Sequence, residues 1–112
     1  MMGYFENTLP DYVTRGVAEH IDQFIIMLLV KMLADMKDSG VEPDYLQVYK
    51  LTYNSENNIL SVHHSQEVPP YEKTLFMELP ENVKAYEGKL YFIDDIQYKT
   101  ILLAEEYWKE VH

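Results

Sequence analysis

The sequence predicts an α+β fold in which one long N-terminal helix packs on a mainly antiparallel sheet of about five or six strands. Apolar residues recur with helical spacing in one long stretch, and with a period of two in several shorter segments after Asp44. The gaps between these segments are too short for the crossovers that parallel strands need. We therefore expect residues 1–112 to form a single domain, with 1–11 as an N-terminal arm and 105–112 as a C-terminal tail.

The long helix is expected from about Ile21 to Ser39. Its apolar positions are three and four residues apart and share one helix face: Ile21, Phe24, Ile25, Leu28, Leu29, Met32 and Met36. Further apolar residues widen this stripe, so the helix should be buried on more than one side. Gly40 is typical of a helix end. Before the helix, Tyr12–Val17 has the composition of a strand closed by a glycine.

Five alternating segments are expected to be strands: Tyr45–Tyr53, Ile59–Gln66, Lys73–Leu79, Lys89–Ile93 and Lys99–Ala104. A polar turn separates the first two, which predicts a hairpin. The prolines of Val68-Pro69-Pro70 interrupt any ladder because proline has no N–H to donate. The tail should form a short helix, docked through aromatic residues that include Trp108.

The composition excludes several classes of function. The chain has no cysteine, which rules out disulfides and thiolate metal sites and fits a cytoplasmic protein. Its net charge of −10 is spread along the chain without a basic cluster, which argues against direct binding to nucleic acid or to an anionic membrane. The longest apolar run, Phe24–Val30, is too short to span a bilayer. No cofactor is expected, because the scattered glycines form no phosphate-binding loop.

The densest titratable groups are His64, Glu67, Asp94 and Asp95. With Glu105, the carboxylates among them could hold magnesium or calcium, and with the histidine they could support acid–base chemistry. Strand alternation places the side chain of His64 inward and that of His63 outward, so only one of these histidines could join a given site. Paired acids at a strand end are more often a solvated turn, which favours a non-enzymatic role and leaves an enzyme as the alternative.

Tyrosines form a second candidate site. Tyr45, Tyr49 and Tyr53 share one face of the first hairpin strand, and the opposite face offers Leu46 and Val48 to the helix. The tyrosine face would then be covered by the ends of the chain or by another protein. Tyrosine suits interfaces because it buries a large area and keeps a polar tip.

Five segments together resemble a known family: Tyr12–Val17, Asp44–Val48, His64–Tyr71, Ile93–Asp95 and Leu102–Tyr107. They are similar to DUF960, a family without assigned activity from staphylococci, enterococci, lactobacilli and relatives, often carried on phage and plasmid DNA. The resemblance covers about residues 12–107. It implies a bacterial or mobile-element setting and no mechanism.

These observations favour a non-enzymatic interaction protein that binds a protein partner or a second copy of itself. A narrower version is an acidic mimic of DNA that occupies a basic nucleic-acid site on its partner. The alternative is a small enzyme or metal-binding protein built around His64, Glu67, Asp94 and Asp95.

Overall fold

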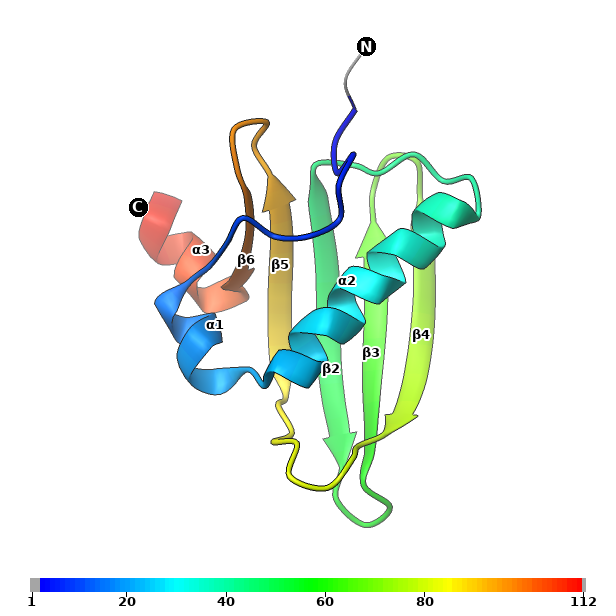
Figure 1. Ribbon diagram of the computed structural model, residues 1–112, viewed down its shortest axis with the longest axis vertical. Helices are drawn as coiled ribbons and strands as arrows, with labels where there is room; N and C mark the ends of the chain where they lie inside the picture. Colours follow the sequence, from blue (N-terminus) through cyan, green and yellow to red (C-terminus); the bar gives the residue numbers. More distant parts are fainter. Residues whose placement is uncertain (1–2, 112) are drawn as a thin grey trace.

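Six strands form one sheet, and the longest helix crosses one face of it diagonally (Figure 1). The computed structural model describes residues 3–111, and side chains as far as residue 107. The sheet order is β1-β6-β5-β2-β3-β4. The elements are β1 (Tyr12–Val13), α1 (Arg15–His20), α2 (Gln23–Asp38), β2 (Leu46–Asn54), β3 (Ile59–Gln66), β4 (Tyr71–Glu78), β5 (Gly88–Asp94), β6 (Lys99–Leu103) and α3 (Ala104–Val111).

Helix α2 begins and ends where local chemistry directs it. The side chain of Asp22 accepts a hydrogen bond from the Phe24 N–H at 2.9 Å, and Gly40 follows the last turn with a φ of +95°. Half of its residues are buried: Ile25, Ile26, Leu28, Leu29, Val30, Met32, Leu33 and Met36. The predicted long helix is therefore present, but it is not the N-terminal element, because β1 and α1 precede it.

The segment expected to be an N-terminal strand divides into two elements. Only Tyr12 and Val13 extend the sheet, and the Thr14 side chain accepts a hydrogen bond from the Val17 N–H and caps α1. The capping threonine outweighs the strand preference of its neighbours. Strand β1 pairs in parallel with β6, so the sheet is mixed. Antiparallel pairing was expected from the short gaps between consecutive segments, whereas residues 14–98 form the connection between β1 and β6.

The remaining strands lie close to their predicted positions. The hairpin of β2 and β3 is present, with Tyr49 opposite His64. Strands β3 and β4 pair antiparallel across the turn that contains Pro69 and Pro70, and β5 pairs with both β2 and β6. Helix α3 occupies the segment predicted as a short C-terminal helix, but the side chain of Trp108 lies outside the described part.

The helix covers the opposite face of β2 from the one expected. Tyr49 is completely buried, and its hydroxyl donates to the Leu29 carbonyl of α2 at 2.9 Å. Leu46 and Val48, which we expected beneath the helix, lie half-buried on the other face. Alternation identifies two rows of side chains, but both rows of β2 contain apolar residues, and tyrosine can be buried wherever its hydroxyl finds an acceptor.

Helices cover the sheet unevenly. The molecule measures 46 × 34 × 20 Å, and the shortest dimension accommodates one sheet and one layer of helix. Helix α3 contacts β5 and β6, where Tyr107 packs edge-on against Tyr91. On the face of the sheet away from α2, Lys50, Thr52 and Phe76 are exposed. No helix among residues 3–111 is long and apolar enough to cross a membrane.

Candidate functional site

His64 lies in the core beneath α2, facing inward as predicted. It is completely buried, and its ring stacks on Tyr49 with centroids 4.4 Å apart. Burial, together with the neighbouring His63, lowers its pKa to about 4, so the ring is neutral at pH 7. Its Nε2 lies 2.7 Å from Gln47 Oε1. Its Nδ1 has no hydrogen-bond partner among the described residues.

Two buried glutamines extend this network to the end of the sheet. Gln47 donates from Nε2 to Gln66 Oε1 at 2.7 Å and to the Asp44 carbonyl at 2.9 Å. Its Oε1 is therefore the acceptor for the proton on His64 Nε2. Gln66 donates to the carbonyls of Glu42 and Pro69, at 3.0 and 2.8 Å. The network joins the loop before β2 to the turn after β3, which is a structural role.

The predicted cluster of titratable groups does not converge. The carboxylate of Asp94 is bonded elsewhere: it accepts hydrogen bonds from the Phe5 N–H at 2.7 Å and from the Ile96 N–H at 2.8 Å. The strand register separates it from His64 by two strand spacings and four residues along the strand, about 16 Å. Glu67, Asp95 and Glu105 are exposed. Residues 3–107 contain no group of three or more histidines and acids that could hold a metal ion.

The three predicted tyrosines do not form one surface. Tyr49 is in the core, and Tyr53 donates from its hydroxyl to Asn58 Oδ1 at 2.7 Å. Tyr45 is 47% exposed and its ring packs against Tyr4, with centroids 6.1 Å apart. Only Tyr45 therefore remains available to a partner, and it stands at the end of the sheet beside the N-terminal arm.

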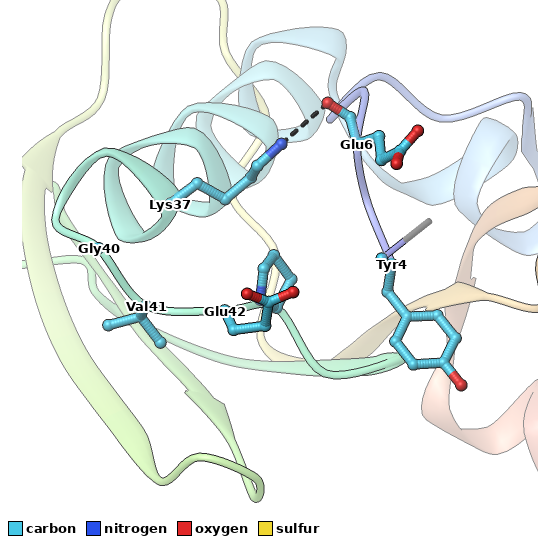
Figure 2. Close-up of a pocket in the computed structure, with 8 residues that line it drawn as sticks. Tyr4, Glu6, Lys37, Gly40, Val41 and Glu42 are labelled. Atoms are coloured by element: carbon cyan, nitrogen blue, oxygen red, sulfur yellow. Dashed lines mark hydrogen bonds between the residues drawn. The ribbon is translucent and has the colours of Figure 1, made fainter. Parts of the chain in front are cut away.

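Tyr4 borders a pocket of about 340 Å³ between the N-terminal arm and the end of α2 (Figure 2). Lys37 points across this pocket toward the arm, and its ammonium donates to the carbonyls of Phe5 and Glu6 at 2.6 and 2.9 Å. Glu6 and Glu42 also line the pocket. Because these two hydrogen bonds occupy the Lys37 ammonium, the lysine holds the N-terminal arm against α2. We therefore assign the contacts around this pocket a structural role.

Strand β4 lies close to the strand predicted over Lys73–Leu79, but its place at the edge of the sheet was not predicted. It lies at the edge of the sheet and pairs with β3 alone. Across the described chain, its outer side has no backbone hydrogen-bond partner. Phe76, in the second half of this strand, is 69% exposed. An apolar residue on the solvent face of an alternating strand was the only signal, because strand order cannot be derived from one sequence.

An apolar groove lies beside this edge, between β4 and α2. Its apolar lining residues are Leu28, Met32, Leu75 and Met77. Lys31, Asp35 and Lys73 also line it, and the first two form a surface ion pair at 3.1 Å. Its volume is about 150 Å³, which is small for a site that encloses a whole organic ligand. The edge and the groove together form one surface, which we call the β4 seam.

Comparison with known proteins gives a family and a fold. The family model described as "Staphylococcal protein of unknown function (DUF960)" matches residues 11–106. A crystal structure of a protein of unknown function from Enterococcus faecalis superposes with a TM-score of 0.77 at 24% sequence identity, covering 95% of this chain and 97% of that chain. No curated protein matches the chain.

Proposed function

The chain belongs to the DUF960 family, and from this premise we propose that it is a non-enzymatic interaction module that binds a protein partner at the β4 seam. The observation that carries the proposal is the coincidence of an unpaired edge strand with an apolar groove on the same side of the molecule. Edge strands left open invite pairing with another chain, and natural domains usually cover or charge them. The buried, neutral His64 and the separated acids supply no competing site for chemistry.

The proposal is tested by site-specific cross-linking in a Gram-positive host. A photoreactive phenylalanine analogue replaces Phe76 in one variant and Tyr12 in another, because these aromatic residues are 69% and 55% exposed on opposite edges. We expect a discrete adduct with a host protein from position 76 and none from position 12. The same adducts from both positions, or no adduct from position 76, would contradict the proposal. An adduct of the chain with itself would replace the partner by a homodimer.

The narrower form of the proposal is that the bound surface of the partner normally holds nucleic acid. It is supported by the net charge of −10 alone. In this form, double-stranded DNA competes for the partner, and raising the salt concentration weakens the complex, because screening reduces attraction between exposed charges. A complex insensitive to both would leave the interaction module and remove the DNA mimic.

A further inference from the structure

We propose that β4 accepts an extended, basic segment of the partner as an added strand, so that binding lengthens the sheet by one strand. This inference rests on the proposed function and names the mode of binding and the chemistry of the partner. Three features of the β4 seam carry it: the direction of the free backbone groups, the charge on the exposed face of the strand, and the size of the groove.

The first feature is the alternation of backbone groups across the sheet. In an antiparallel strand, one residue directs both its N–H and its carbonyl to one neighbour, and the next residue directs them to the other side. The Tyr45 carbonyl accepts from the Asp94 N–H at 2.9 Å, so the backbone N–H and carbonyl groups of odd-numbered residues in this segment point toward β5. The backbone groups of even-numbered residues of β2 therefore point toward β3, where these residues lie opposite odd-numbered residues of β3.

The same alternation continues to the edge. The backbone N–H and carbonyl groups of even-numbered residues of β3 point toward β4, and the register places His64 opposite Lys73. Odd-numbered residues of β4 are thus bonded to β3, and the outward-facing backbone groups belong to the even-numbered ones: Glu72, Thr74, Phe76 and Glu78. These four residues present four N–H donors and four carbonyl acceptors in a row. A strand lying alongside would satisfy them in the way that β-strand addition does in known peptide-binding domains.

The second feature is charge. The same four residues carry their side chains on the uncovered face of the sheet, where they supply two carboxylates and no basic group. Residues of an added strand that lie opposite Glu72 and Glu78 are favoured when they are lysine or arginine. The net charge of −10 also attracts a cationic segment at long range.

Charge also decides between a foreign segment and a second copy. If two β4 strands paired antiparallel with full overlap, Glu72 of one would lie opposite Glu78 of the other, at both ends of the ladder. Like charges directly opposite each other destabilise a strand pair. Two chains of charge −10 also repel each other before contact. The seam therefore suits a basic partner better than another molecule of this protein.

The third feature is the groove. In an added strand, the residues between the basic ones point to the α2 side of the sheet, toward Leu75 and Met77. A cavity of about 150 Å³ accommodates a single apolar side chain more readily than a free ligand. The preferred segment is therefore extended and alternates basic with apolar residues.

The test uses a synthetic peptide of about ten residues in which valine and lysine alternate, with both ends capped. A block peptide of the same composition, with all valines before all lysines, controls for charge. Binding to the full chain is followed by nuclear magnetic resonance, residue by residue. We expect the alternating peptide to shift and protect the amides of Glu72, Thr74, Phe76 and Glu78, and the block peptide to leave them unchanged.

Two substitutions of Phe76 distinguish the contribution of its backbone N–H to peptide binding from that of its side chain. Phe76→Ala removes the exposed ring and keeps the outward N–H, whereas Phe76→Pro removes both. We expect Phe76→Pro to weaken peptide binding about fivefold or more relative to Phe76→Ala, since one hydrogen bond is lost and the proline ring obstructs the partner strand. The thermal unfolding midpoint of each variant verifies that the fold is retained.

Equal affinity of the two variants, shifts located away from β4, equal binding of the block peptide, or no binding up to about millimolar peptide would each overturn strand addition. These outcomes test the mode of binding, whereas the cross-linking experiment tests whether a partner binds at the β4 seam at all. A host protein cross-linked at position 76 but bound equally by Phe76→Pro and Phe76→Ala would keep the interaction module and reject the added strand.

Discussion

The two edges of the sheet are built in opposite ways. At one edge, the two-residue strand β1 is tied to β6 by the Asp11 N–H, which donates to the Lys99 carbonyl at 2.8 Å, and by Lys99, whose N–H donates to the Asp11 carboxylate at 2.8 Å. At the other edge, β4 presents eight residues that are bonded on one side only. The fold therefore protects one edge of its sheet with a very short strand and leaves the longer edge strand open.

The closed edge depends on close contacts between the ends of the chain. The Gly16 N–H of α1 donates to Glu106 Oε2 of α3 at 3.1 Å, and the Thr14 hydroxyl donates to Glu106 Oε1 at 2.6 Å. A Cβ added at Gly16 would lie 2.6 Å from Glu106 Oε2 and 2.8 Å from Leu103 Cδ1, so a larger residue there would displace these side chains. No comparable contact covers β4 within the described residues.

The largest expected difference in stability is between substitutions of two phenylalanines, one buried and one exposed. Phe5 of the N-terminal arm is completely buried and packs edge-on against Phe92 at 4.8 Å, whereas Phe76 is mostly exposed. We expect Phe5→Ala to lower the free energy of unfolding by about 4 kcal/mol, because a large buried side chain leaves a cavity. Phe76→Ala should change it by less than about 0.5 kcal/mol. Urea unfolding of both variants measures the difference, and equal losses would show that the arm is not part of the core.

Proline substitutions at neighbouring positions of β4 test which side of the strand is open. Leu75→Pro removes an N–H that bonds to β3, and we expect a loss of about 3 kcal/mol in unfolding free energy. Phe76→Pro removes an N–H that faces outward and should cost about 1 kcal/mol or less. Urea unfolding compares the pair. If Phe76→Pro were the more damaging, the assignment of outward-facing groups would be reversed.

The buried histidine predicts how stability depends on pH. His64 has a folded pKa of about 4, below the ordinary value of 6.5, so the unfolded state binds its proton first as the pH falls. Its contribution is fully present above pH 6.5 and decreases toward pH 4. Between pH 7.5 and 5 we expect a loss of about 2 kcal/mol. The measurement is the difference in this loss between the wild type and His64→Phe, and parallel pH profiles would contradict the buried neutral ring.

The smallest effect is expected at the ion pair of the closed edge. Lys99 lies 3.2 Å from Asp11, and hydrogen bonds to Lys99 lower the pKa of that carboxyl. Lys99→Met keeps most of the aliphatic stem and the backbone bonds, so we expect little or no change in stability, because an exposed ion pair is screened by solvent. Thermal unfolding in low and high salt checks it. A large fall in the unfolding midpoint would mean that the charge pair, rather than the backbone, closes this edge.

Local patterning was sufficient to predict α2, the hairpin of β2 and β3 and the inward position of His64. The helix follows from apolar spacing between Asp22 and Gly40, and the hairpin from alternation on both sides of a polar turn. These features depend on residues close together in the chain. The capping role of Thr14 is also local, but the strand-like composition of Tyr12–Val17 conceals it in the sequence.

The candidate site could not be predicted in the same way. Asp94 is the last residue of β5, near the N-terminal arm, whereas His64 lies two strands away under α2, and no spacing in the sequence gives that separation. The tyrosine row was correctly placed on one face of β2, but the helix covers that face. Long-range pairing determines such positions.

The positions of the long helix and of most strands follow from short stretches of sequence, since periodicity and capping act over a few residues. The strand order, the parallel pairing of β1 with β6 and the exposure of β4 depend instead on how distant segments pack together. Strand order is a choice among pairings between distant segments, and backbone hydrogen bonds are nearly the same in each. The packing of the whole core selects one of them.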